Sequence, residues 1–115
     1  SAVKVVAASV ELTGVQMIDT NLAYSDFSGA NLPDADFAGS RLAHAVFDHA
    51  NLRAALLTDC ELHGISAVGI SLQGADLRGS QLDGLDVREI DLTGVRISFD
   101  QQSTLLEPLG LVISD

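Results

Sequence analysis

The residues best suited to metal binding or nucleophilic chemistry are few. They are one cysteine, Cys60, and three histidines, His44, His49 and His63. Zinc requires ligands within about 2 Å of one ion, and the five-residue spacing of His44 and His49 brings no third ligand to them. No serine or cysteine has a histidine base placed beside it. We therefore expect no catalytic residue, no metal and no cofactor.

The elements that position these residues follow a period of five. An apolar residue recurs at every fifth position without insertion or deletion, which is neither the helical period of 3.6 nor the strand period of 2. An internal repeat of this kind decides the architecture. The series is Leu12, Met17, Leu22, Phe27, Leu32, Phe37, Leu42, Phe47, Leu52, Leu57, Leu62, Ala67, Leu72, Leu77, Leu82, Val87, Leu92 and Ile97.

The position two residues before each apolar centre is small or apolar, and the residue between them is mostly polar. Small and large side chains then point to one side of a very short strand and the polar side chain points to the other. Cys60 occupies a small position, so we expect it to be a buried filler. The small positions include Ser25, Ala30, Ala35, Ser40, Ala45, Ala50, Ala55, Ile65, Ile70, Ala75, Ser80, Leu85 and Ile90.

Glycine marks the corners of the repeat. Nine of the ten glycines lie two residues after an apolar centre, where a type II turn requires a positive φ. Pro33 follows a centre directly, at the turn position that favours proline. The chain therefore alternates short strands with corners, and repeated corners close it into a stackable coil.

Several units resemble the A(D/N)LXX signature of pentapeptide repeat proteins: Ala30-Asn31-Leu32, Ala35-Asp36-Phe37, Ala50-Asn51-Leu52 and Ala75-Asp76-Leu77. The resemblance implies an all-β fold, a right-handed quadrilateral parallel β-helix with twenty residues per coil. We assign this β-helix to residues 1–97, with residues 1–10 as an imperfect first half-coil. Residues twenty apart, such as Leu32 and Leu52, should then lie over one another.

Residues 98–115 leave the five-residue phase and form a separate C-terminal region. Asp100 is positioned to cap a short helix over residues 101–107, ended by Pro108 or Gly110. Residues 111–113 are expected to form a short strand. We expect the apolar side chains here to plug the last coil and also to meet a second copy in an isologous dimer. The predicted dimerisation residues are Leu105, Leu106, Pro108, Leu109, Leu111 and Ile113.

Residues 82–97 and 101–110 closely resemble the C-terminus of the Qnr quinolone-resistance proteins, and Asn21-Leu22-Ala23-Tyr24 is similar to another of their segments. The resemblance implies a homodimeric rod that engages DNA gyrase or topoisomerase IV in place of duplex DNA and modulates the enzyme or shields it from quinolones. The residues predicted to face the topoisomerase are Asp26, Asp36, Asp76 and Asp86. The bacterial cytosol is the location that the family implies.

The net charge of −10 disfavours direct nucleic-acid binding and adhesion to an anionic membrane. It favours a basic partner, although acidity also maintains solubility. A second hypothesis is a structural solenoid without topoisomerase activity, since the phase between Leu12 and Ile97 holds none of the loops that Qnr proteins typically carry. A C-terminal fragment, an engineered minimal rod and a naturally short homologue all fit this pattern. An enzyme has no supporting constellation of residues.

Overall fold

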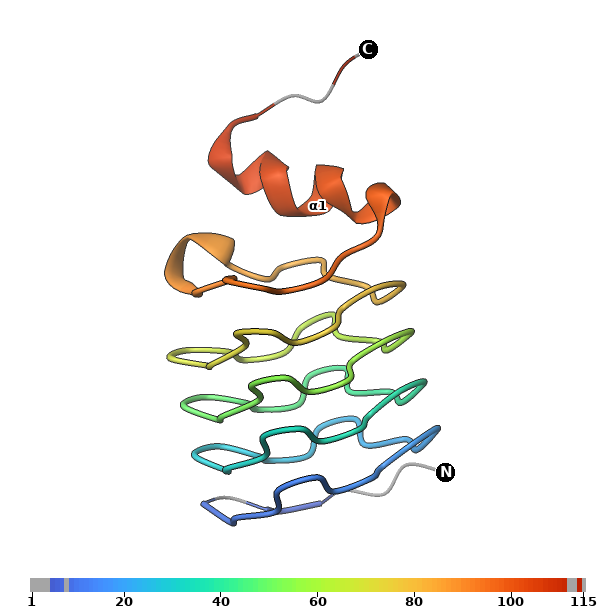
Figure 1. Ribbon diagram of the computed structural model, residues 1–115, viewed down its shortest axis with the longest axis vertical. Helices are drawn as coiled ribbons and strands as arrows, with labels where there is room; N and C mark the ends of the chain where they lie inside the picture. The colour runs from blue at the N-terminus through green and yellow to red at the C-terminus, as the bar shows by residue number, and fades with distance from the viewer. Residues whose placement is uncertain (1–4, 8, 112–113, 115) are drawn as a thin grey trace.

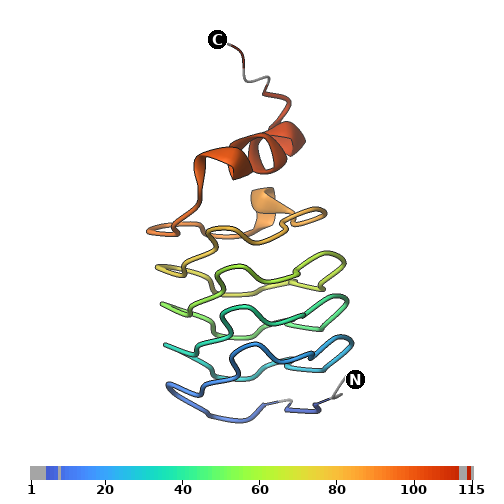
Figure 2. The same ribbon diagram turned by 90° about the vertical axis from the view of Figure 1, so that its right-hand side faces the viewer.

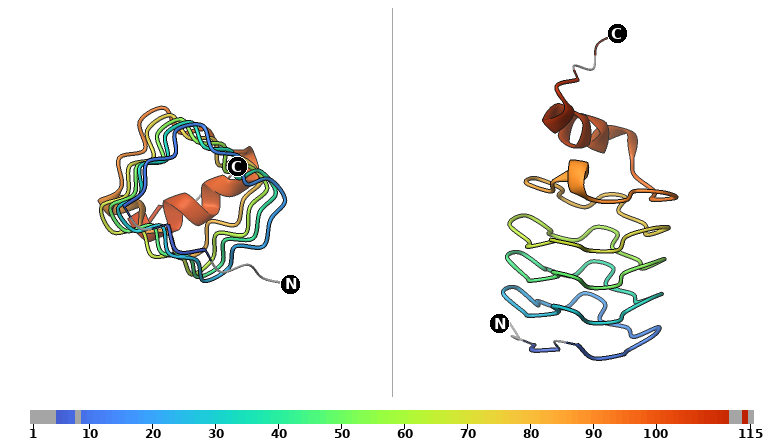
Figure 3. Two further views of the ribbon diagram at one scale, coloured as in Figure 1. Left: turned by 90° about the horizontal axis from the view of Figure 1, so that it is seen from below. Right: turned by 90° about the vertical axis from the view of Figure 1, so that its left-hand side faces the viewer.

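The chain winds into a stack of similar coils with a short helical region across one end (Figure 1). The computed structural model describes residues 5–7, 9–111 and 114. The first and last described residues lie at opposite ends of the stack, as the perpendicular view also shows (Figure 2). Seen along the stack, the coils have a four-sided outline and the C-terminal helix lies over it (Figure 3). The molecule, coils and helical region together, is 43 Å long along its longest axis.

The expected twenty-residue register is confirmed. Isolated parallel bridges join residues twenty apart, among them Asn31 with Asn51 and Asp36 with Leu56. The amide of Leu32 donates to the Asn51 carbonyl at 2.8 Å, and the Asn51 amide donates to the Ala30 carbonyl at 2.9 Å. Val6 pairs in the same way with Asp26, so this residue keeps the phase of the repeat. Each side is so short that pairing consists of single bridges. The described residues form no strand longer than one bridge.

The large side chains at the apolar centres fill the inside of the coil. Phe27 and Phe47, twenty residues apart, stack nearly parallel with ring centroids 5.1 Å apart, and Phe37 meets both edge-on. All three rings are fully buried. Offset stacking and edge-to-face contacts are the arrangements that aromatic rings prefer. The aromatic layer therefore fixes the spacing of the coils between residues 27 and 47.

Inward serines at the small positions tie coils together by hydrogen bonds. The hydroxyl of Ser40 accepts from the Thr20 amide at 3.1 Å, and that of Ser80 accepts from the Cys60 amide at 2.9 Å. Ser80 also donates to the carbonyl of Leu57. These buried hydroxyls are satisfied, so the core tolerates them at positions that alanine fills elsewhere.

The corners adopt the positive φ expected for glycine, but other residues occupy them too. Gly64 has φ +72°, and a Cβ there would lie 2.4 Å from Nδ1 of His44 in the preceding coil. His44 itself has φ +60°. A side chain at one corner thus lies across a glycine in the next coil. Glycine here serves close stacking as well as backbone freedom.

The regular pairing fails at one side of the last coil. The five-residue phase predicts a short strand at residues 85–87, but Val87–Glu89 form a 3-10 helix, η1, capped by Asp86. The bridges that would join Ser66 to Asp86 and Ser71 to Asp91 do not form, whereas Asp76 pairs with Arg96 further on. The unbroken phase in the sequence therefore conceals a local opening between two coils.

The C-terminal region forms a continuous helical segment of three elements. These are η2 (Phe99–Gln101), α1 (Gln102–Leu106) and η3 (Glu107–Leu109), and the segment ends at Gly110 with φ +78°. Ser98, not Asp100, is the cap, because its amide donates to the Gln101 side chain at 2.7 Å. Asp100 lies within the first turn instead. Leu105 is buried against the core, as expected of a plug.

Candidate functional site

Each predicted topoisomerase-facing aspartate also closes a local turn. Oδ1 of each side chain accepts the backbone N–H of the residue two positions later. This is the Asx-turn that aspartate and asparagine side chains commonly make. The acceptor–donor pairs are Asp26 with Ser28 (2.9 Å), Asp36 with Ala38 (3.0 Å), Asp76 with Arg78 (3.1 Å) and Asp86 with Arg88 (3.2 Å).

Asp76 does not present a free negative charge. Its residue is only 6% exposed, and Nη2 of Arg78 donates to Oδ2 at 2.6 Å. The hydrogen bond from Arg78 lowers the pKa of the Asp76 carboxyl below its ordinary value. The stacked Arg96 makes no ion pair with it. Asp76 is therefore an ion-pair partner of Arg78, and its role in facing a topoisomerase stays a prediction.

Asp26 and Asp36 lie on different sides of the rod. Asp36 bridges to Leu56, which bridges to Asp76, so Asp36 and Asp76 share one side, as expected. Leu56 between them is 42% exposed. Asp26 bridges to Val46 on another side, but Asp86 departs from that column because it caps η1. Asp26 and Asp36 are half-buried and Asp86 is exposed.

The C-terminal end carries an apolar groove of about 380 Å³ between the last coil and the helical segment. Leu105 forms its base, and Leu109 and Leu111 next to it are 49% and 54% exposed. Pro108 is also exposed, and Leu106 is half-buried. Ile113 lies outside the described residues. The groove is lined by Val87, Leu92, Ile97, Gln102, Leu105, Leu106 and Leu109.

Gln101 locks this end in place, a role that we did not predict. Its Nε2 donates to the carbonyls of Leu77 at 2.6 Å and Ser80 at 2.8 Å, while Oε1 accepts from the Ser98 amide. The residue is 6% exposed. Ser98 and Gln101 have the spacing of a capping box, which is the signal in the sequence that could have identified it.

Cys60 is buried in the core, whereas two of the histidines contact each other. Burial raises the pKa of the Cys60 thiol to about 11, and its Sγ donates to the Phe37 carbonyl at 3.1 Å, so Cys60 is the buried filler that we expected. His44 stacks on Tyr24 with ring centroids 5.0 Å apart and meets His63 edge-on. Within residues 5–7, 9–111 and 114, no three His, Cys, Asp or Glu side chains gather closely enough to hold a metal ion.

A helix long and apolar enough to cross a membrane does not occur among the residues that the structure describes.

The family model for pentapeptide repeats matches the chain in eight copies, over residues 11–47, 35–70 and 55–94. The chain belongs to the pentapeptide repeat family. Proteins of this family fold as right-handed quadrilateral β-helices and are generally structural or binding proteins. The twenty-residue register and the four-sided outline agree with that architecture.

Several solved pentapeptide repeat proteins are similar in structure. The protein alr5209 from Nostoc PCC 7120 is 24% identical with a TM-score of 0.53, covering 81% of this chain and 80% of its own. A trypsin-treated variant of QnrB1, described as a plasmid-mediated fluoroquinolone resistance protein, is 16% identical with a TM-score of 0.40 over the whole of both chains. No curated protein sequence matches the chain.

Replacing Gln101 with leucine should destabilise the protein by about 1–3 kcal/mol, because the carbonyls of Leu77 and Ser80 lose their donors while staying covered. Urea unfolding measures this change. The matched control is Gln102→Leu, at a half-buried glutamine whose side chain makes no hydrogen bond to another described residue. Its effect should stay within about 0.5 kcal/mol. Equal losses in the two variants would contradict the proposed lock.

Replacing Asp76 with asparagine should give a stability loss that depends on pH. The folded pKa of Asp76 lies below the unfolded value of 3.8, so the ionised carboxylate stabilises the fold above that pH and ceases to do so as the pH falls through the folded pKa. The difference in unfolding free energy between wild type and variant should be largest near neutral pH. It should shrink as the pH falls below about 4.

Unfolding free energies measured across the pH range check this expectation. Asp86→Asn serves as the control because Asp86 pairs with Arg88 at 3.3 Å in an exposed position, where ion pairs contribute only about 0–1 kcal/mol. A gap for Asp76→Asn that stays constant with pH would rule out the Arg78 pair as its cause.

Proposed function

We propose that this chain is an acidic binding protein that engages DNA gyrase or topoisomerase IV in place of DNA, and that it modulates the enzyme or protects it from quinolones. The observation that carries the proposal is the net charge of −10 on an elongated molecule 43 Å long. The resemblance of residues 82–97 and 101–110 to the C-terminus of Qnr proteins supplies the choice of partner. The proposal places the protein in the bacterial cytosol, where these enzymes act.

The charge density of the molecule is lower than that of duplex DNA. Ten net charges over 43 Å amount to one per 4.3 Å of length, compared with one per about 1.7 Å of duplex axis. Over the same length, the rod therefore presents fewer charges than DNA does to a basic DNA-binding surface of the enzyme. Its association should be fast, steered by charge and weakened by salt.

We further propose that two copies join through the C-terminal groove. Leu109 and Leu111 are half-exposed beside a groove whose base is the buried Leu105, and a second copy would cover them. An isologous contact places the two coils on opposite sides of a two-fold axis, which doubles the acidic length. We propose that each copy has the right-handed quadrilateral winding of the family.

The structural-solenoid hypothesis stays open because the same aspartates close turns. The hydrogen bonds of Asp36 to Ala38 and of Asp26 to Ser28 give these residues a role in the coil that needs no partner. The two hypotheses differ in one property, since only the binding hypothesis requires the charge of these side chains in addition to their oxygen acceptors.

Binding to purified DNA gyrase and inhibition or protection in supercoiling and cleavage assays test the first hypothesis. A triple variant, Asp26→Asn, Asp36→Asn and Asp86→Asn, removes charge but keeps the acceptor for each turn. It should weaken binding on the order of tenfold at about 50 mM salt, and less at about 200 mM.

The matched control neutralises three corner carboxylates instead, by Asp19→Asn, Asp34→Asn and Asp59→Asn. These residues are exposed and have positive φ, a conformation that asparagine tolerates. Net charge changes equally in both triples, so a larger loss for the first set locates the contact on the sides of the rod. Absence of any gyrase binding by the parent protein at low salt would favour the structural solenoid.

Replacing Leu109 with aspartate should convert a dimer into a folded monomer, because the charge would be buried without a partner in the interface. Light scattering gives the mass and circular dichroism checks the fold. Leu105 is unsuitable for this test, since it belongs to the core. The control is Ile18→Asp on the first coil, where Ile18 is 46% exposed. A wild-type mass of one chain, or an unchanged dimer in Leu109→Asp, would refute the interface.

A further inference from the structure

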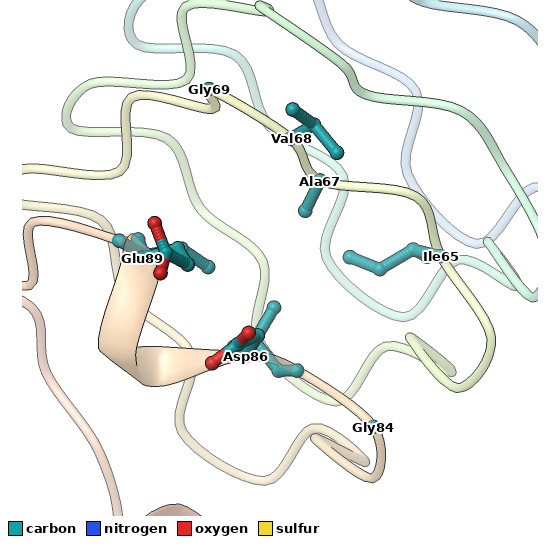
Figure 4. A pocket seen from close by; sticks show the side chains of 9 residues that line it. Ile65, Ala67, Val68, Gly69, Gly84, Asp86 and Glu89 are labelled. Atoms are coloured by element: carbon teal, nitrogen blue, oxygen red, sulfur yellow. The ribbon is translucent and has the colours of Figure 1, made fainter.

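The opening between the last two coils forms a groove of about 330 Å³. Figure 4 shows Ile65, Ala67 and Val68 along one lip, and Asp86 and Glu89 on the other, which includes η1. The interior is mainly apolar because Leu85 also lines it. The groove shares no lining residue with the C-terminal groove, although η1 contributes to both.

One lip of the groove is a strand edge that has lost its neighbour. In the coil below, the amides of Phe47 and His49 donate to the carbonyls of Ser66 and Val68. The equivalent donors one coil later are the amides of Ala67 and Gly69, and no backbone carbonyl of the described residues accepts from them. The carbonyl of Ile65 likewise receives no backbone amide. Unpaired groups of this kind are a template for an added strand.

This lip is held firmly from below, so it is ready to receive a strand without rearrangement. Asp48 accepts from the Ser66 hydroxyl at 2.6 Å and from the Val68 amide at 3.0 Å. Ser66 also bridges to Val46. These contacts fix the edge on the side away from the groove and leave the Ala67 and Gly69 amides facing the opening.

The other lip supplies negative charge. Glu89 is exposed, and no hydrogen bond or ion pair joins its side chain to another described residue. Asp86 is partly neutralised by Arg88, whose Nε lies 3.3 Å from Oδ1. Glu89 is therefore the principal unpaired carboxylate facing a ligand here, and the acidic rod as a whole favours a basic one.

We propose that this groove binds an extended peptide segment of another protein, with apolar residues alternating with basic ones, as an added β-strand. The segment would take the place that residues 86–88 hold in a regular coil. Its carbonyls would accept from Ala67 and Gly69, and one of its amides would donate to Ile65. Its apolar side chains would enter the groove and its basic side chains would meet Glu89. The proposal does not depend on topoisomerase binding.

A synthetic capped peptide of about six alternating arginine and valine residues is the probe, titrated into the isotope-labelled full chain. We expect the amide resonances of Ala67 and Gly69 to shift and their hydrogen exchange to slow on binding. A peptide with glutamate in place of arginine should not bind. The same arginine peptide with N-methylated backbone should bind much more weakly, because it cannot donate to Ile65.

Charge variants separate groove binding from general attraction to the acidic rod. Glu89→Lys should weaken binding by about fivefold or more, and Glu89→Gln by a smaller factor in the same direction. The matched control, Glu11→Lys, makes the same charge change at an exposed residue of the first coil and should alter affinity by less than about twofold. Circular dichroism confirms that each variant is folded.

The proposal fails if the arginine peptide does not bind at low salt. It also fails if the peptide binds without protecting the Ala67 and Gly69 amides, or if Glu11→Lys and Glu89→Lys weaken binding equally. Gyrase takes no part in these measurements, so their outcome is separate from that of the proposed topoisomerase function.

Discussion

The structure depends on the pairing of backbone groups twenty residues apart. Each side of the coil is too short to form more than a single bridge, so no side is stable by itself. The bridges hold only because the side chains above and below also stack, as Phe27 does on Phe47. Burial of the large centres and satisfaction of the backbone are therefore achieved together. A change that prevents close approach of two coils affects both at once.

The opening beside η1 shows what happens when that approach is blocked. At the small positions of neighbouring coils, usually at most one of the two facing residues is large. Val10, for example, precedes Ala30 by one coil, and the adjoining bridge from Glu11 to Asn31 forms. At the opening, large residues occupy the small positions of both coils: Ile65 and Leu85 are twenty residues apart, and so are Ile70 and Ile90. Neither of the adjoining bridges forms there. We attribute the opening to overfilled small positions, because inserting bulk into a packed core displaces backbone.

The period of five was enough to predict the register, the corner glycines and the burial of Cys60, because each follows from which way a residue points. It could not predict the opening, since the same phase holds through residues 85–87 whether or not two coils can approach. Nor could it distinguish Arg78 from Arg96 as the partner of Asp76, a choice set by side-chain reach. The spacing of Ser98 and Gln101 could have predicted the cap from the sequence. The carbonyls to which Gln101 donates depend on the fold and could not.

Asparagine at the same repeat position separates the structural role of the aspartates from their charge. Asn21 and Asn51 accept the amides of Ala23 and Arg53 through Oδ1, just as Asp26 and Asp36 accept those of Ser28 and Ala38. Asn51 also donates to Asn31 in the coil below at 2.8 Å, a contact that two stacked carboxylates could not make. The turn therefore requires an acceptor but not a charge. The negative charge on Asp36 is therefore additional to what its turn needs, and binding or solubility must account for it.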